Sequence, residues 1–163
     1  MNVDITAKRV ESIYRVNMRI GSVLLPVKYD TGAKYTVISA KVFNSELTDE
    51  NLSEINNYCE KKCNNKERFI SASGHSFYGY LVEAHNVKMG NTLLESFRYY
   101  LIVENKRDIA LLGFDFIDSC KGSFEPHKDI VISEFDDADY NTPDGAMDND
   151  EVITFIDSLT VNQ

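Results

Sequence analysis

The chain has 163 residues, 43% of them hydrophobic, and a formal net charge of −9. A chain of this length buries one hydrophobic core, so a single domain is expected, and an acidic chain of this kind is an unlikely match for nucleic acid. No apolar run approaches the roughly 20 residues of a membrane helix and the N-terminus lacks a signal-peptide pattern, so we expect a soluble cytoplasmic protein that makes no membrane contact.

The first predicted element is a β-hairpin centred on Gly21 and Ser22. The runs "SIYRVNMRI" and "VLLPVKY" flank this pair, and both are rich in the β-branched and aromatic residues that favour strands. A glycine followed by a small polar residue suits the tight turn between two antiparallel strands.

Residues 48–62 are predicted to form a helix inserted over the sheet. Thr48 offers an N-cap hydroxyl, acidic residues follow in the first turn, and lysines stand in the last turn. Leu52, Ile55 and Cys59 fall on one stripe of this helix, which indicates the face that packs against the sheet.

The three cysteines are Cys59, Cys63 and Cys120. Their odd number and their spacing match no disulfide framework, which favours reduced thiols. Cys59 and Cys63 would share one face of the predicted helix, but no second pair of ligands has the spacing of a metal site. We therefore expect neither a metal nor another cofactor.

The rest of the body also reads as strands. "RFISASGHSFYGYLVEAHNVKM" has two extended arms about Ser73 and Gly74, and a turn at Gly90 and Asn91 leads into the strand "TLLESFRYYLIVE". "IALLGFDFIDSC" predicts an apolar strand, a glycine and a helical turn, and two short strands follow about Pro126. These elements indicate an all-β domain with two minor helices.

Residues 136–163 are predicted to be an acidic linker followed by a short apolar segment. All 17 basic residues precede this stretch, which is rich in aspartate. Near its end, Val152, Phe155, Ile156 and Leu159 recur at the spacing of an amphipathic helix. This segment is either a docked end of the domain, which could join a dimer interface, or a separate peptide that binds a partner or the active site.

Asp30 raises the question of function, because it ends an apolar strand and is followed by Thr31, Gly32 and Ala33. The small residues leave backbone N–H groups free to approach the carboxylate. Taken alone, this D-T-G-A motif also fits a turn with an aspartate cap. Its context favours a functional role, because the motif is followed by "KYTVIS" and, some 80 residues later, by "IALLGFD", with a glycine-tipped hairpin between them.

This order of motifs resembles the retropepsin family of aspartic proteases. The likeness extends from about Tyr14 to Phe135 and is greatest to the retroviral-protease-like domains of the DNA-damage-inducible shuttle proteins and of bacterial relatives. It implies a single-domain acid protease barrel over residues 1–135, with the helical insertion at 48–62 and a flap hairpin at 69–79. Tyr29, where an aliphatic residue is usual, and the length of the insertion depart from the family pattern.

The resemblance also implies which residues form the site. Asp30 matches the catalytic aspartate, Thr31 the threonine whose hydroxyl bonds across a dimer, and Gly32 the substrate-contacting loop. For Phe77 and for Ile70, ordinary sheet packing is the alternative to contact with a substrate. The residues implied to bind substrate are Ala33, Ala72, Ser73, Gly74, Phe77 and Leu112.

One aspartate of this type per chain implies a homodimer, because the chemistry needs two carboxylates and no second D-[ST]-G occurs. We therefore expect a homodimeric aspartic endopeptidase that cleaves peptide or protein substrates, with Asp30 from each chain activating a water molecule. The alternative is a homodimeric binding or assembly module of the same fold that is catalytically silent.

Overall fold

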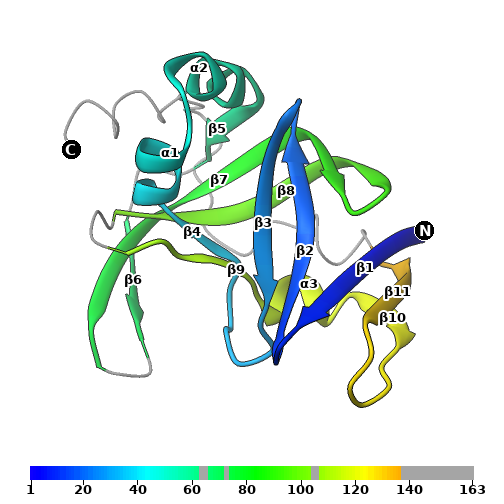
Figure 1. Cartoon of the computed structure of the whole chain (residues 1–163). Coiled ribbons are helices and arrows are strands. Elements are labelled where there is room, and N and C mark those ends of the chain that lie inside the picture. The colour runs from blue at the N-terminus through cyan, green and yellow to red at the C-terminus, as the bar shows by residue number, and fades with distance from the viewer. Residues whose placement is uncertain (63–65, 72–73, 104–106, 137–163) are drawn as a thin grey trace.

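Strands predominate in the computed structural model, which describes residues 1–62, 66–71, 74–103 and 107–136. The expected all-β character, with few helices, is confirmed (Figure 1). The strands are β1 (Asn2–Val10), β2 (Ile13–Ile20), β3 (Val23–Tyr29), β4 (Val37–Ser39), β5 (Cys59–Lys61), β6 (Glu67–Ile70), β7 (Ser76–Met89), β8 (Thr92–Ile102), β9 (Ala110–Leu112), β10 (Cys120–Ser123) and β11 (Ile130–Phe135). The helices are α1 (Ala40–Glu46), α2 (Asp49–Tyr58) and α3 (Phe114–Ile117).

The strands pair in the order β10-β11-β1-β2-β3-β9-β4-β8-β7-β5, and β6 pairs with β7. β2 also pairs with β7, so the pairings from β2 through β3, β9, β4 and β8 to β7 form a closed path. Most neighbours are antiparallel, but β3 with β9 and β4 with β8 are parallel. The short strand β9 therefore lies between β3 and β4, which are close in sequence, and joins them to a distant part of the chain.

Both tight hairpin turns predicted from glycine pairs are confirmed. Ile20 pairs with Val23 across the first turn, and Met89 pairs with Thr92 across the second. The glycines at these turns have φ values of 60° and 59°, in the left-handed region that glycine adopts without steric cost. These turns fix the register of β2 with β3 and of β7 with β8.

The predicted helix at 48–62 begins as expected but ends early. The Thr48 hydroxyl accepts a hydrogen bond from the Asn51 N–H (3.2 Å), and α2 then ends at Tyr58. The next three residues form β5 and pair antiparallel with β7. Strand pairing satisfies their backbone groups, and Cys59 is buried (1% exposed) instead of completing a helical stripe.

This early end also corrects the expectation that Cys59 and Cys63 share a helix face. Cys59 lies on β5, where its sulfur accepts a hydrogen bond from the Tyr99 hydroxyl (3.7 Å). Burial raises the pKa of its thiol to about 12, so the thiol stays protonated. Cys63 lies outside the described residues, and both Cys59 and Cys120 are free thiols.

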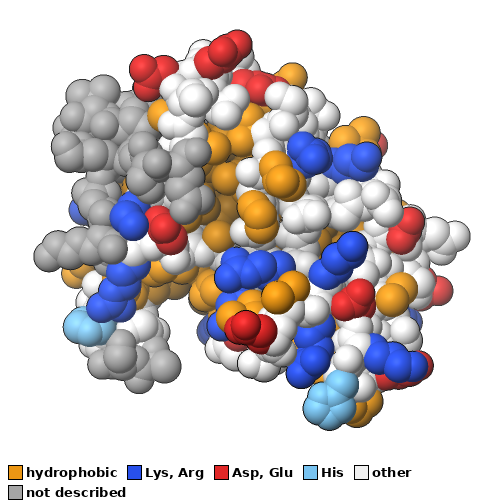
Figure 2. Space-filling model, viewed as in Figure 1, with side chains coloured by type: hydrophobic (Ala, Val, Ile, Leu, Met, Phe, Trp, Pro, Cys, Tyr) orange, Lys and Arg blue, Asp and Glu red, His pale blue; other side chains and the backbone are white. Residues whose placement is uncertain are grey.

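Glu54 fastens α2 to the turn between β2 and β3. Its carboxylate accepts hydrogen bonds from the Ser22 N–H (2.8 Å) and from the Ser22 hydroxyl (2.8 and 2.9 Å). A Cβ on Gly21 would come within 2.5 Å of a Glu54 carboxylate oxygen, so a larger residue there would force the Glu54 side chain to shift away from Ser22. Figure 2 shows acidic side chains gathered at the top of the molecule, over α2.

Replacing Glu54 with glutamine should lower the stability of the protein at neutral pH and should matter less in acid. The hydrogen bonds from the Ser22 backbone and side chain lower the pKa of Glu54. A carboxyl with a lowered pKa stabilises the fold above its ordinary pKa, and this stabilisation is lost as the pH falls through the folded value. Urea unfolding of both proteins between pH 3 and pH 7 tests this, and a difference that stays constant with pH would contradict it.

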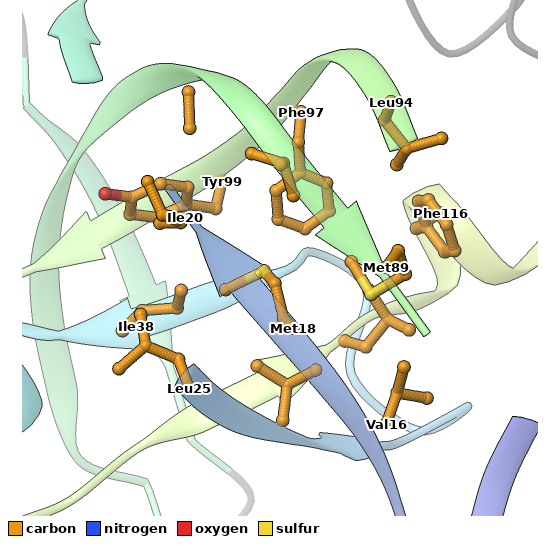
Figure 3. Packing of buried hydrophobic residues seen from close by; sticks show 14 of the residues in the cluster. Val16, Met18, Ile20, Leu25, Ile38, Met89, Leu94, Phe97, Tyr99 and Phe116 are labelled. Carbon is orange, nitrogen blue, oxygen red and sulfur yellow. The ribbon is translucent and has the colours of Figure 1, made fainter. Parts of the chain in front are cut away.

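The core lies within the closed path of strands. Along β2, Val16, Met18 and Ile20 are buried while the residues between them are exposed, which is the alternation of a strand with one face inside. Figure 3 shows Met18 and Ile20 gathered with Phe97 and Tyr99 of β8 in this core. Burial of this apolar face stabilises the packing of β2, which pairs with β1, β3 and β7, against β8.

Strand β1 and helix α1 were not predicted from the sequence. β1 pairs with β11 and then with β2, and so joins the terminal strands to the rest of the sheet. The two short strands predicted about Pro126 are confirmed as β10 and β11.

The predicted acidic linker and apolar segment cannot be compared with the structure, because residues 137–163 lie outside the described residues. Within the described part of the chain, no helix is long and apolar enough to cross a membrane.

Candidate active site

Asp30 lies at the end of β3, directly after the residues that pair with β9. Lys28 pairs with Leu111 and Tyr29 with Leu112 in a parallel register. The Asp30 N–H then donates a hydrogen bond to the Leu112 carbonyl (3.0 Å). The side chain of Asp30 is half-buried, so its carboxylate sits at the surface on a backbone that β9 holds in place.

The loop after Asp30 turns back on the carboxylate itself. The Gly32 N–H donates to Asp30 Oδ1 (3.0 Å), and the Ala33 N–H donates to the Asp30 carbonyl (3.2 Å). A Cβ on Gly32 would lie 3.3 Å from Oδ1, which is tighter than ordinary contact. The first bond fixes one carboxylate oxygen against the loop, so the second oxygen is the one free to meet other groups. Thr31 and Gly32 are exposed beside it.

The far side of the loop is fastened to the start of α3. The Phe114 N–H donates to the Ala33 carbonyl (2.7 Å), and the Asp115 N–H donates to the Lys34 carbonyl (3.1 Å). Together with the bond from Asp30 to Leu112, these contacts clamp both arms of the loop to one stretch of chain. A loop held at both arms keeps its carboxylate in a defined position.

Thr36 and Asp115 form a buried hydrogen-bond network beneath the loop. Asp115 Oδ1 accepts from the Thr36 N–H (3.0 Å), from the Thr36 hydroxyl (2.7 Å) and from the Phe116 N–H (2.8 Å). The Thr36 hydroxyl in turn accepts from the Gly113 N–H (3.0 Å), and Thr36 is 0% exposed. Burial raises the pKa of the Asp115 carboxyl, and the hydrogen bonds from Thr36 act against that rise.

From the sequence alone, Asp115 is expected to have a structural role as a partner of the local backbone after Gly113, and nothing in the sequence indicates Thr36. The bond to the Phe116 N–H is local, but Thr36 lies 79 residues away in sequence. The available signal was a threonine directly before the apolar residues of β4, and such a residue does not name its partner. Gly113 is required at the contact, because a Cβ there would lie 2.3 Å from the backbone of Tyr35.

The hairpin of β6 and β7 stands beside this loop, at the lower left of Figure 1. At its end, the Gly74 N–H donates to the Ser71 carbonyl (2.9 Å), and Gly74 has a φ of 87°. The predicted hairpin at 69–79 is thus confirmed as a structural element. Ala72 and Ser73, expected at its tip, lie outside the described residues.

The other residues expected to bind substrate lie in different environments. Ala33 is half-buried in the loop, and Phe77 is half-buried on the hairpin. Ile70 is 65% exposed, so sheet packing, the alternative considered for it, does not describe it. The Leu112 side chain is 0% exposed, and the part of this residue that reaches the loop is its carbonyl, which accepts from Asp30.

The comparison with solved structures identifies the architecture. A crystal structure of a retropepsin-like aspartic protease from Rickettsia conorii matches with a TM-score of 0.52 and 13% sequence identity. The match covers 82% of this chain and 93% of that one. The chain has a retropepsin-like fold. Neither a protein-family model nor a curated protein sequence matches it, and the finer likeness to the DNA-damage-inducible shuttle proteins stays a prediction.

Proposed function

We propose that this chain is an aspartic endopeptidase that works as a homodimer within an acid protease barrel. The observation that carries the proposal is the Asp30 carboxylate, half-buried at the end of β3 on a loop clamped by backbone hydrogen bonds, in a chain with the retropepsin-like fold. A solvated turn with an aspartate cap is held by local hydrogen bonds, whereas this loop is also held by backbone hydrogen bonds to Leu112 and to the start of α3.

The proposed chemistry needs a second carboxyl, which the partner chain supplies. The Asp115 carboxyl beneath the loop is engaged through its Oδ1 by Thr36 and Phe116, so it is assigned a supporting role. In the dimer, Asp30 of each chain meets its counterpart at the two-fold axis. Two adjacent carboxyls cannot both ionise easily, so they share one proton.

In the proposed reaction, the ionised carboxylate takes a proton from a bound water while the protonated carboxyl hydrogen-bonds the scissile carbonyl. The water oxygen attacks the carbonyl carbon, and the tetrahedral intermediate then breaks its C–N bond. A proton from the pair goes to the departing nitrogen, which restores the starting state. The Gly32 N–H holds one oxygen of Asp30, and the Thr31 hydroxyl is proposed to bond across the dimer.

The hairpin of β6 and β7 is proposed to cover the bound peptide. Excluding bulk water strengthens the electrostatic interactions at the carboxyl pair, and a hairpin with glycine at its end can open and close. Ala72, Ser73, Gly74 and Phe77 are the hairpin residues proposed to contact substrate, with Ala33 on the loop side. The segment after residue 136 is proposed as a tethered ligand of the same site.

Incubation of the full chain with a diverse peptide library, followed by mass spectrometry, tests the proposal. We expect internal cleavage of extended peptides between pH 4 and pH 8 by a protein that sediments as a dimer. A folded dimer that leaves every peptide intact would contradict the proposal and favour a silent binding module of the same fold.

A further inference from the structure

Four aromatic side chains form a wall between the loop that follows Asp30 and the β6–β7 hairpin. Ring centroids lie 5.8 Å apart for Tyr35 and Phe69, 4.9 Å for Phe69 and Tyr100, and 5.3 Å for Tyr35 and Tyr100. Phe77 is paired directly opposite Phe69, so both side chains lie on one face of the hairpin. All four are half-buried, and we call them the aromatic wall.

Two cations rest on this wall. The Lys34 ammonium lies 5.2 Å from the centre of the Tyr35 ring, and the Arg107 guanidinium carbon lies 6.0 Å from the centre of the Phe77 ring. These distances fit cation–π contacts, which keep each charge beside a ring. One cation comes from the loop that follows Asp30 and the other from the segment before β9.

Neither cation has a carboxylate within ion-pair distance among the residues that the structure describes. The acidic neighbour of Arg107 in sequence is Asp108, and its carboxylate pairs with Lys41 of α1 instead (3.2 Å). Lys34 and Arg107 thus present positive charge beside an apolar surface. In Figure 2, blue and orange side chains border the notch between the hairpin at lower left and the centre of the molecule.

We propose that this surface selects substrate peptides with a glutamate or aspartate close to the cleaved bond, the acidic side chain lying on the aromatic wall between Lys34 and Arg107. The inference rests on the proposed function, because it assigns a substrate class to the same site. An extended peptide presents alternate side chains to one side, so one of them meets the wall. The stem of a glutamate packs on the rings while its carboxylate meets the two cations.

The hairpin offers a matched control on its other face. The Lys66 ammonium lies 5.5 Å from the centre of the Tyr78 ring, so it makes the same kind of contact. Tyr78 is adjacent to Phe77 on β7 and therefore points to the opposite face of the hairpin. Reversal of the charge at Lys66 changes the net charge of the protein as much as reversal at Lys34, but away from the aromatic wall.

The test compares peptides that differ only by glutamate or glutamine at each position near the cut. With the unmutated full chain we expect kcat/KM to favour the glutamate peptide about five-fold at one position, the size of a partly solvated ion pair. Lys34→Glu and Arg107→Glu should each abolish or reverse this ratio, whereas Lys66→Glu should preserve it. Ratios within one variant cancel any general effect of a new charge near Asp30.

Fluorescence anisotropy of the same labelled peptides on the same proteins separates the two proposals. Preferential binding of the glutamate peptide without cleavage would retain the inference and overturn the peptidase. The inference would be overturned if glutamate and glutamine peptides were bound and cleaved equally well, or if neither peptide were bound or cleaved. It would also be overturned by a preference that survives in both Lys34→Glu and Arg107→Glu, or one that Lys66→Glu removes equally.

Discussion

Replacement of Asp30 by asparagine should abolish peptide cleavage and leave the fold intact. The asparagine carbonyl oxygen can still accept the hydrogen bond that the Gly32 N–H gives to Asp30 Oδ1. The amide cannot take a proton from water, and in a homodimer both carboxyls are lost at once. We expect the cleavage rate to fall by at least about 10³-fold, the range typical of lost acid–base catalysis. Initial rates of peptide cleavage and thermal unfolding of both proteins measure the two halves of this expectation.

Asp118→Asn is the matched control, because Asp118 is an exposed aspartate at the end of α3, the helix whose start contacts the loop, and has no place in the proposed site. It should cleave peptides at the unmutated rate. Cleavage that continues at full rate in Asp30→Asn would show that another group performs the chemistry.

Mixed dimers test whether the two Asp30 carboxyls act together. In an equal mixture of unmutated and Asp30→Asn chains that exchange freely, about a quarter of the dimers carry both carboxyls. If the pair is required, activity per chain should fall to about a quarter of the unmutated value. A fall to only about half would mean that each chain works with its own carboxyl alone.

The features predicted correctly from the sequence are those with local causes. The turns at Gly21 and Gly90 depend on a residue that tolerates positive φ, and the strands beside them alternate or are rich in β-branched residues. The short helix after Gly113 likewise follows an apolar strand and a glycine. Such signals lie within a few residues of the structure that they specify.

The features that were missed depend on partners far away in the chain. α2 ends at Tyr58 because the next residues pair with β7, which follows some 20 residues later. β9 joins β3 in parallel through a contact that spans more than 80 residues. The hydrogen bonds that hold the Asp30 loop also come from a distant part of the chain. The motif therefore predicted the position of the carboxylate, but the sequence did not predict the contacts that hold the loop.

Asp115→Ala should destabilise the protein strongly, whereas Asp115→Asn should be tolerated. Alanine leaves the Thr36 N–H and the Thr36 hydroxyl without their acceptor, while the Phe116 N–H keeps only its bond to the Gly113 carbonyl (3.1 Å). Each unpaired buried group costs about 1–3 kcal/mol, so a loss of roughly 3 kcal/mol or more is expected from urea unfolding. Asparagine keeps an oxygen with two lone pairs at the position of Oδ1, so it can still accept both bonds from Thr36, and the Phe116 N–H keeps the Gly113 carbonyl as its acceptor.

The two variants also differ in their response to pH, and this separates the charge of Asp115 from its hydrogen bonds. Burial raises the pKa of the carboxyl, so its contribution is full below the ordinary aspartate value of about 3.9 and is lost as the pH rises through the folded value. Asp115→Asn lacks this titration and should gain stability relative to the unmutated protein over that interval. Since Asp115 supports the loop and does not touch the substrate, Asp115→Asn should cleave peptides normally. Asp115→Ala, where it still folds, should lose kcat more than it raises KM, because Asp30 is then held less firmly.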